Sequence, residues 1–265
     1  MREYLNMSEA DASLLQALRL DGQVAAITGG ARGIGYEAAR LFVASGARVV
    51  LLDRDGDEAA LAADRLGSAA AAVQVDAASE VDVDRVFTEI ESRYQRLDVL
   101  VNNAGIAIRR PTVELSLDDW QKVLEVNMTG VFLCARAAAR LMLPKGSGAI
   151  VNTASIMGFS GGGLYPNISY QATKGAVVNM TRAWAVEWAA AGIRVNGVAP
   201  TWTETDFISG LKAQPHLLER IRSVTPMARL AQAVEVAHAI LFLASPAASM
   251  VTGQILAVDG GFLAQ

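Results

Sequence analysis

One stretch, residues 24–35, decides how the rest of the chain folds. It reads Val24-Ala25-Ala26-Ile27-Thr28-Gly29-Gly30-Ala31-Arg32-Gly33-Ile34-Gly35. Its first residues are small, apolar or β-branched, which is typical of a buried strand. The glycines that follow let the backbone turn sharply and approach a ligand with no Cβ in the way. A helix that begins at Gly33 would point its free N–H groups at that ligand, and such a helix end favours a pyrophosphate.

An acidic residue follows at the distance that a dinucleotide site needs. A second apolar strand, residues 49–53, ends in Asp53, about twenty residues beyond Gly33. A carboxylate at that strand end can accept hydrogen bonds from the hydroxyls of an adenosine ribose. A glycine-rich structural turn is the alternative. The strand, glycines, helix, second strand and acid in this order favour a dinucleotide site.

Apolar strands alternate with helical stretches along the chain. Strands are expected near residues 24–28, 49–53, 72–75, 98–102, 148–153, 194–198 and 254–258, and helices near 33–45, 57–66, 79–93, 116–142, 169–190 and 232–244. This alternation predicts an α/β fold with a single doubly wound parallel sheet of about seven strands and helices on both faces. No linker divides the chain, so residues 21–265 are expected to form one Rossmann-fold domain after an N-terminal extension, residues 1–20. Ligands of such a sheet bind at the carboxyl ends of its strands.

Composition argues against several other classes of protein. The 265 residues carry a net charge of −4 and no basic cluster, so no nucleic-acid partner is expected. The N-terminus lacks the apolar core of a signal peptide, and no uninterrupted apolar run has the length of a membrane span. The single cysteine, Cys134, cannot form an internal disulfide, which fits a cytoplasmic protein. His216 and His238 have no partners at ligand spacing, so no metal site is expected.

Further motifs follow the glycine-rich turn in a fixed order. They are Asn102-Asn103-Ala104-Gly105, then Ser155, then Tyr170-x3-Lys174, then Pro200 with Thr205, and finally Val258-Asp259-Gly260-Gly261. With them, the spacing Thr28-Gly29-x3-Gly33-x-Gly35 resembles the short-chain dehydrogenase/reductase family, from about residue 21 to the end of the chain. One residue departs from the family pattern, because Thr201 stands where a glycine usually follows the proline.

The resemblance implies a catalytic tetrad of Asn127, Ser155, Tyr170 and Lys174. Tyr170 would be the general acid/base, Lys174 would hold the ribose, Ser155 the substrate oxygen, and Asn127 a water that links Lys174 to solvent. A free tyrosine has a pKa near 10, so we expect the lysine ammonium and the positive nicotinamide to lower it. Asparagine is a poor residue inside a helix, so Asn127 also predicts a local irregularity there.

The resemblance further implies a set of nucleotide-binding residues at the strand ends. They are Gly29, Arg32, Gly33, Ile34, Gly35, Asp53, Asp76, Ala77, Asn103, Gly105, Tyr170, Lys174, Pro200 and Thr205. Two of them conflict over the cofactor. Arg32 is placed to hold a 2′-phosphate, whereas Asp53 would repel that phosphate and pair with a free hydroxyl. We expect Asp53 to prevail, so NAD is the expected cofactor and NADP a secondary one.

Three functions are compatible with these motifs. The first is an NAD-dependent oxidoreductase that interconverts a secondary alcohol and a ketone. Fifteen residues separate Ser155 from Tyr170, and the extra length in residues 161–167 resembles members acting on polyols or sugars. The second is an NADPH-dependent 3-oxoacyl-thioester reductase, for which Asp53 is the obstacle. The third is a non-catalytic NAD-binding sensor or scaffold, against which the complete tetrad argues.

The sequence also predicts a lid over the site and an interface between subunits. Residues 206–225 mix polar and apolar side chains and are interpreted as a mobile lid over the substrate. The helices at 116–142 and 169–190 carry alanine-rich apolar faces, as in family members that pair through these helices, so a homotetramer is expected.

Overall fold

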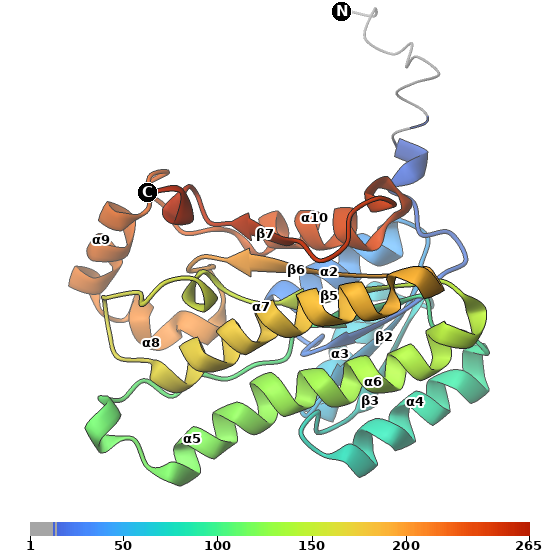
Figure 1. Ribbon diagram of the computed structural model, residues 1–265, viewed down its shortest axis with the longest axis horizontal. Coiled ribbons are helices and arrows are strands. Elements are labelled where there is room, and N and C mark those ends of the chain that lie inside the picture. The colour runs from blue at the N-terminus through green and yellow to red at the C-terminus, as the bar shows by residue number, and fades with distance from the viewer. Residues whose placement is uncertain (1–12, 14) are drawn as a thin grey trace, which may run out of the picture.

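A parallel sheet of seven strands runs through the molecule, in the order β3-β2-β1-β4-β5-β6-β7 (Figure 1). In the computed structural model, residue 13 and residues 15–265 are described. The strands are β1 (Val24–Thr28), β2 (Arg48–Asp53), β3 (Ala70–Gln74), β4 (Val99–Asn102), β5 (Gly148–Thr153), β6 (Ile193–Pro200) and β7 (Ile255–Val258). The order reverses between β1 and β4, which puts a topological switch point at the centre of the sheet. The Rossmann-type fold predicted from the sequence is confirmed.

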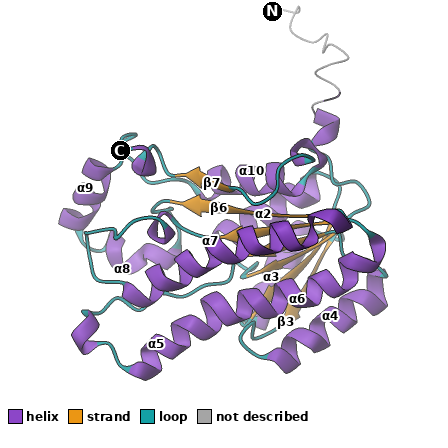
Figure 2. Cartoon of the chain, viewed as in Figure 1, coloured by secondary structure: helices purple, strands orange, loops and turns teal. Residues whose placement is uncertain are grey.

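Helices cover both faces of the sheet (Figures 1 and 2). They are α2 (Gly33–Ala44), α3 (Gly56–Leu66), α4 (Glu80–Tyr94), α5 (Leu117–Leu124), α6 (Gly130–Met142), α7 (Ile168–Trp188), α8 (Ser209–Lys212), α9 (Pro215–Val224) and α10 (Ala233–Ala244). Helices α4, α6 and α7 pack on one face, and α2, α3 and α10 pack on the other. Short 3₁₀ turns lie at η1 (Thr112–Glu114), η3 (Leu143–Lys145), η4 (Ile156–Gly158), η5 (Ala189–Ala191), η6 (Asp206–Ile208), η7 (Pro246–Ala248) and η8 (Phe262–Ala264).

Successive strand residues enter the two halves of the core. Ala26 and Leu52 belong to the cluster under α4, α6 and α7, whereas Ile27 and Leu51 belong to the cluster under α2, α3 and α10. This alternation follows from the two-residue period of a strand. Strands buried on both faces need apolar residues at every position, which explains the continuous hydrophobic runs in the sequence.

The structure shows two helices in residues 206–225, and the expectation that this segment is a mobile lid stays a prediction. This segment contains η6, α8 and α9, and its apolar side chains form a third hydrophobic cluster with Met157 and Trp202. Helix α9 has a signal in the sequence, since Leu217, Ile221 and Val224 recur at helical spacing after Pro215, whereas the four residues of α8 are too few to show a period.

The long helix expected at 116–142 is interrupted by a π-helical turn, Glu125–Thr129. By length and composition the helical run Leu117–Lys145 could cross a membrane, but 56% of its most apolar window is buried within the fold. It is therefore placed as a core helix, covering one face of the sheet with α4 and α7.

The predicted N-terminal extension lies largely outside the described residues. Near its end, Leu20 is fully buried and packs in the same cluster as Phe42. Its backbone N–H donates to the carbonyl of Ser45 at 2.8 Å. The chain is thus anchored to the sheet layer a few residues before β1.

Close backbone approaches fix the turn between β1 and α2. Gly29 and Gly33 have φ values of +63° and +58°, in the left-handed region that favours glycine. A Cβ on Gly35 would lie 2.1 Å from the carbonyl oxygen of Gly29 and 2.7 Å from Nδ2 of Asn103. A side chain at Gly35 would therefore force the first turn of α2 away from the strand ends.

We expect Gly35→Ala to destabilise the protein by about 1–3 kcal/mol, because the clash is with backbone that cannot rotate away. Binding of NADH should weaken with it, since the turn would open. Urea unfolding and NADH fluorescence titration measure the two effects. Gly210→Ala is the matched control, because a Cβ on Gly210 meets nothing within 4 Å. Equal stability of the two variants would contradict the packing argument.

Candidate active site

Two adjoining cavities lie at the carboxyl edge of the sheet, across the switch point. The larger, about 450 Å³, extends from the turn after β1 to Phe207 in η6. The smaller, about 390 Å³, is bounded by Asp53, Asp76 and Ala77 after β2 and β3. Arg32, Arg54 and Gly105 line both cavities, so the two form one elongated site.

The N-terminus of α2 opens into the larger cavity. Gly29, Gly33 and Ile34 line the wall there, and the N-cap residue Arg32 makes no capping hydrogen bond with its side chain. The first N–H groups of a helix have no partners within the helix. The turn is therefore a concave surface with backbone donors and partial positive charge, which suits a pyrophosphate.

Asp53 stands at the end of β2 and is 9% exposed. One carboxylate oxygen accepts the N–H of Ala31 at 3.2 Å, and the other accepts the N–H of Asp55 at 3.2 Å. The carboxylate thus braces the glycine-rich turn as well as facing the smaller cavity. The sequence predicted that Asp53 faces the nucleotide site, but it did not predict the hydrogen bonds that brace the glycine-rich turn.

Buried amides tie the strand ends together. Asn103 Nδ2 donates to the carbonyls of Thr28 at 3.2 Å and Gly29 at 3.1 Å. On the other side of β4, Asn102 Nδ2 donates to Asn152 Oδ1 at 2.9 Å. The expected link between neighbouring strand ends is therefore present, and it runs from β1 through β4 to β5.

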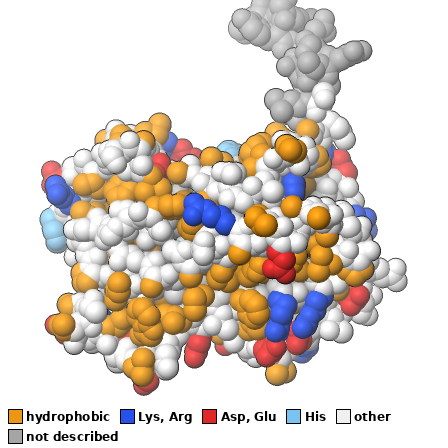
Figure 3. Space-filling view, viewed as in Figure 1, with side chains coloured by type: hydrophobic (Ala, Val, Ile, Leu, Met, Phe, Trp, Pro, Cys, Tyr) orange, Lys and Arg blue, Asp and Glu red, His pale blue; other side chains and the backbone are white. Residues whose placement is uncertain are grey.

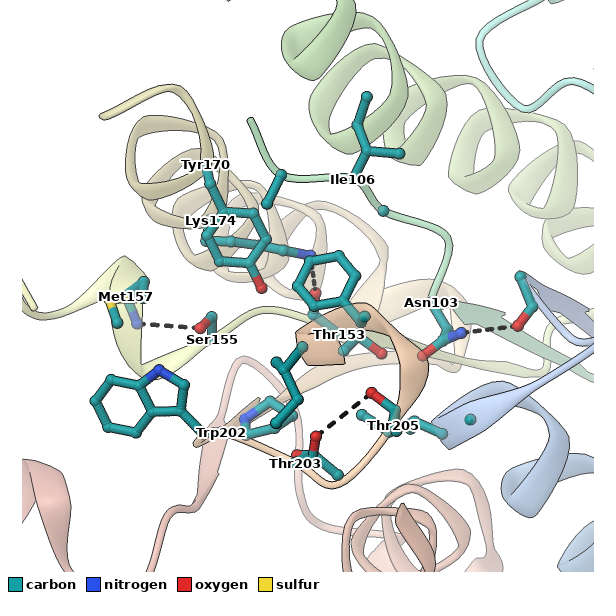
Figure 4. A pocket seen from close by; sticks show the side chains of 18 of the residues that line it. Asn103, Ile106, Thr153, Ser155, Met157, Tyr170, Lys174, Trp202, Thr203 and Thr205 are labelled. Atoms are coloured by element: carbon teal, nitrogen blue, oxygen red, sulfur yellow. Dashed lines mark hydrogen bonds between the residues drawn. The ribbon is translucent and has the colours of Figure 1, made fainter. Parts of the chain in front are cut away.

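Ser155, Tyr170 and Lys174 converge on the larger cavity (Figure 4). Ser155 Oγ accepts the N–H of Met157 at 3.1 Å, which orients the hydroxyl, and Ser155 lies close enough to Tyr170 to lower its pKa. Lys174 Nζ lies 5.5 Å from the Tyr170 ring centroid and donates to the carbonyl of Thr153 at 2.6 Å. Tyr170 and Lys174 come from adjacent turns of α7, and Ser155 follows β5.

The pKa values differ from the sequence expectation. Burial raises the pKa of Tyr170 to about 12, and the nearby hydroxyl of Ser155 and the charge of Arg109 oppose this rise without cancelling it. Burial also lowers the pKa of Lys174 to about 8, because the ammonium loses its hydration. The side chains of the protein therefore keep Tyr170 protonated near neutral pH. The expected lowering of its pKa does not come from Lys174 in this arrangement.

Asn127 lies behind the cavity wall, in the π-helical turn. Its Oδ1 accepts the N–H of Ile106 at 2.8 Å, and its Nδ2 donates to the carbonyl of Ile106 at 2.9 Å and to Thr173 Oγ1 at 3.2 Å. The predicted irregularity at this residue is confirmed. The side-chain amide is occupied by Ile106 and Thr173, so the water expected at Asn127 stays a prediction.

The end of the larger cavity beyond Tyr170 is built from segments whose role was hard to predict. Tyr165 and Asn167 come from the insertion before α7, Trp202 follows β6, and Phe207 belongs to η6. Trp202 Nε1 donates to the hydroxyl of Tyr165 at 2.7 Å, which joins two walls of the cavity. Arg109, from the loop after β4, completes this end.

Most of the residues predicted from the sequence line the two cavities. Those that do are Gly29, Arg32, Gly33, Ile34, Asp53, Asp76, Ala77, Asn103, Gly105, Ser155, Tyr170, Lys174, Pro200 and Thr205. Gly35 and Asn127 do not, since they act on the cavity wall from behind. Residues 161–167, which end in Asn167, were expected beside the substrate, whereas Arg109 and Trp202 were not predicted as cavity residues. The only signal for Arg109 and Trp202 is that each follows a predicted strand by a few residues.

The residues present fit a nicotinamide dinucleotide. The open N-terminus of α2 can receive the pyrophosphate, and Asp53 and Asp76 line the smaller cavity where an adenosine would lie. Thr153 Oγ1 and Thr201 Oγ1 are buried without hydrogen-bond partners beside Ser155 and Pro200. Buried polar atoms without partners are uncommon, and they suit a polar ring amide at the nicotinamide end.

Comparison with known proteins defines the class. A family model described as enoyl-(acyl carrier protein) reductase matches residues 29–263. The chain belongs to the short-chain dehydrogenase/reductase family and is an oxidoreductase acting on CH–OH groups with NAD(P).

Three relatives illustrate the range of this family. A galactitol 2-dehydrogenase (L-tagatose-forming) of Cereibacter sphaeroides is 43% identical, over 92% of this chain and 96% of its own. A cis-4-hydroxycyclohexanecarboxylate dehydrogenase of Sinomonas cyclohexanicum is 45% identical, over 91% and 97%. The crystal structure of a gluconate 5-dehydrogenase from Burkholderia cenocepacia J2315, in complex with NADP and tartrate, superposes with a TM-score of 0.91. It is 39% identical and covers 95% of this chain and 99% of its own.

The lowered pKa of Lys174 predicts a pH dependence of stability. Between about pH 8 and 10.5 the unfolded chain holds a proton on this lysine that the folded protein lacks, so its contribution to the free energy of unfolding rises with pH. Lys174→Met removes the buried ammonium. We expect this variant to gain stability over the wild type near neutral pH, and the gain to shrink as the pH rises through that window.

Urea unfolding without nucleotide, at several pH values, measures this difference. The exposed Lys145, which lines neither cavity, supplies the control Lys145→Met. Parallel pH profiles for the wild type and Lys174→Met would contradict the assignment.

Proposed function

We propose that this protein is an NAD-dependent dehydrogenase that interconverts a secondary alcohol and a ketone on a polyol or sugar skeleton. One observation carries the proposal. Ser155, Tyr170 and Lys174 line the same cavity as the glycine-rich turn, so proton transfer and nicotinamide binding share one space. A non-catalytic scaffold would have no need of a partly buried tyrosine beside a buried lysine and serine at that position.

The proposed mechanism assigns one task to each side chain. Ser155 holds the substrate oxygen, with its own orientation fixed by the N–H of Met157. Tyr170 exchanges a proton with that oxygen, and its raised pKa keeps it in the protonated form that can donate to a carbonyl. Lys174, held by Thr153, fixes the ribose beside Tyr170. A nicotinamide held here would supply the hydride chemistry and, in its oxidised form, a positive charge that favours the Tyr170 phenolate.

Asn127 acts as a positioning residue in this proposal. Through Ile106 it fixes the loop after β4, and through Thr173 it fixes the turn of α7 that precedes Lys174. The full set of fourteen nucleotide contacts expected from the sequence remains part of the proposal.

Names of relatives support the substrate class. The relatives act, by their names, on a polyol, on a cyclic hydroxy acid and on gluconate. All of these are secondary alcohols with further polar groups. The cavity end formed by Asn167, Trp202 and Arg109 offers polar partners of that kind, so a hydroxylated substrate fits better than an acyl thioester.

The proposed preference for NAD rests on the placement of Asp53. Its carboxylate faces the smaller cavity beside Arg32 and Arg54. A free ribose hydroxyl can donate to it, whereas a 2′-phosphate would meet like charge. Arg32 and Arg54 reduce that repulsion, so NADP remains a secondary cofactor in the proposal.

We also propose a homotetramer located in the cytoplasm. Hydrophobic side chains gather over α5, α6 and α7 (Figure 3). Among them, Val186 is 83% exposed, Leu117 68% and Phe132 42%. Apolar surface of this extent is typical of a subunit interface. The single thiol, Cys134, is buried and unpaired, which fits a reducing compartment.

We expect Tyr170→Phe to lower kcat by roughly 10²–10⁴-fold, because only the oxygen that transfers the proton is lost. NADH binding should remain close to that of the wild type. Steady-state kinetics with NAD and a panel of polyols and hydroxy acids, followed by NADH absorbance, measures the first effect, and fluorescence titration the second. Tyr94→Phe, at the far end of α4, is the control. Retention of a tenth of the wild-type kcat would remove Tyr170 from the mechanism.

We expect removal of the Asp53 charge to reduce the preference for NAD over NADP by about 10- to 100-fold, since a charge-assisted hydrogen bond contributes about 1.5–3 kcal/mol. Asp53→Asn is preferable to Asp53→Ser, because an amide oxygen can still accept the N–H of Ala31 and keep the turn in place. The ratio of kcat/KM for the two cofactors is the measurement, and the exposed Asp57 supplies the control Asp57→Asn. A wild-type preference for NADP would overturn the assignment.

We expect light scattering at micromolar concentration to give four times the mass of the chain, which is 28.0 kDa. Val186→Asp should lower this mass, because it places a charge within the proposed apolar interface. A wild-type mass of 28.0 kDa would exclude the tetramer.

A further inference from the structure

Arg109 occupies an unusual position at the substrate end of the larger cavity. It follows β4 in the loop that also carries Gly105, and it lines the cavity together with Ser155 and Tyr170. Its guanidinium carbon lies 5.4 Å from the centroid of the Tyr165 ring and 5.6 Å from that of Phe207. Two aromatic rings from separate segments therefore hold one cation in place. Such contacts restrain the plane of a guanidinium but leave its N–H edge free.

The charge of Arg109 has no acidic partner in the described part of the chain. No carboxylate there lies within 4.0 Å of it, and its Nε is buried with no hydrogen-bond partner. Asp206 also lines the cavity, but its side chain is exposed and forms no ion pair with Arg109. The neighbouring Arg110 behaves as a surface arginine, since its side chain is 58% exposed and lies 3.9 Å from Asp119.

A partly buried arginine without a partner suits a ligand that brings the missing anion. Removal of a charged group from water is unfavourable unless it is paired and hydrogen-bonded. A guanidinium matches a carboxylate in shape, because two parallel N–H groups can meet its two oxygens. Asn167, which is 4% exposed, supplies a second unused group, since its Oδ1 is buried in the same cavity without a donor. That oxygen can accept a hydrogen bond from a substrate hydroxyl.

We propose that the substrate is a hydroxy acid, whose carboxylate binds Arg109 while its reacting hydroxyl lies between Ser155 and Tyr170. This inference rests on the dehydrogenase function proposed above and narrows its substrate class to anionic secondary alcohols. In the oxidation, Tyr170 first releases its proton to solvent beside the positive nicotinamide; the carbinol carbon then gives a hydride to NAD⁺, and its hydroxyl gives a proton to the Tyr170 phenolate. The products are a keto acid, NADH and a proton, and the carboxylate is unchanged.

A purely structural role for Arg109 makes a different prediction. If the guanidinium served only to hold Phe207 and Tyr165 together, its removal would impair neutral and anionic substrates alike. If it binds the carboxylate, its removal affects anionic substrates selectively, and does so through KM. Pairs of substrates that differ only in the charged group separate the two roles.

The experiment compares gluconate with glucitol, and cis-4-hydroxycyclohexanecarboxylate with its methyl ester, using NAD and the full-length protein. We expect the wild type to favour at least one of the two carboxylates over its neutral partner by about 10- to 100-fold in kcat/KM. Arg109→Gln should abolish this preference by raising the KM for the carboxylate, while the KM for the neutral partner stays close to that of the wild type; any effect on kcat through the pKa of Tyr170 is shared by both substrates. Arg109→Lys keeps the positive charge but lacks the two parallel N–H groups, so its preference for the carboxylate should lie between those of the wild type and Arg109→Gln. Arg110→Gln should match the wild type.

Binding gives a second readout that does not depend on turnover. Calorimetric titration of the Tyr170→Phe variant with NAD bound should show binding of a carboxylate probe, and the double variant with Arg109→Gln should lose it. If no probe is oxidised but this pattern is found, the proposed reaction fails and the anion site stands. If the wild type oxidises both members of each pair equally, or if Arg109→Gln impairs both equally, the anion site is refuted and the dehydrogenase stands. The anion site is also refuted if the kinetics show no preference for a carboxylate and calorimetry shows no carboxylate binding.

Discussion

The contact between the backbones of Gly29 and Gly35 is the constraint on which the site depends. The end of β1 and the first turn of α2 approach so closely that a single methyl group at Gly35 would overlap the carbonyl of Gly29. Asn103 closes the same junction from β4, with its amide on the carbonyls of Thr28 and Gly29. Because the junction lies at the switch point, its geometry sets both the opening of the α2 N-terminus and the path of the loop that leads to Gly105. Everything that a dinucleotide and its substrate touch is positioned relative to this junction.

Hydrogen bonds between buried side chains connect β4 to β5 and β5 to α7. The hydrogen bond from Asn102 to Asn152 joins β4 to β5, and Asn152 Nδ2 donates in turn to Thr181 Oγ1 on α7 at 2.9 Å. Helix α7 also carries Tyr170 and Lys174, so its distance from the sheet is fixed by a chain of hydrogen-bonded buried amides as well as by apolar packing. Such networks specify one arrangement, since an unpaired buried amide is costly. The reacting groups are thereby held on rigid elements, while the lining from Tyr165, Trp202 and Phe207 comes from loops.

The sequence predicts the scaffold better than it predicts the cavity, for physical reasons. Strand and helix patterns and the glycine spacing are local, so the sheet, the turn after β1 and the four-residue separation of Tyr170 and Lys174 can be derived from them. Helix α8 could not, because its four residues are too few to show a period and its buried Leu211 packs in a cluster with Met157 and Trp202, which are distant in sequence. Arg109 and Arg110 are adjacent and chemically identical in the sequence, and only the rings of Tyr165 and Phe207 distinguish them. The raised pKa of Tyr170 likewise depends on burial that no motif records.

The π-helical turn at Glu125–Thr129 restricts which residues of the site can be substituted independently of one another. Glu125 and Val126 line the smaller cavity, whereas Asn127, the next residue, holds Ile106 and Thr173 on the side of the reacting groups. One helical turn therefore lines the smaller cavity and also holds the segments next to Lys174 in place. A substitution of Glu125 or Val126 that changes the smaller cavity is therefore expected to move Asn127 as well, and with it the turn of α7 that precedes Lys174. Evolution can alter loop residues such as Arg109 one at a time, but it must alter this turn as a unit.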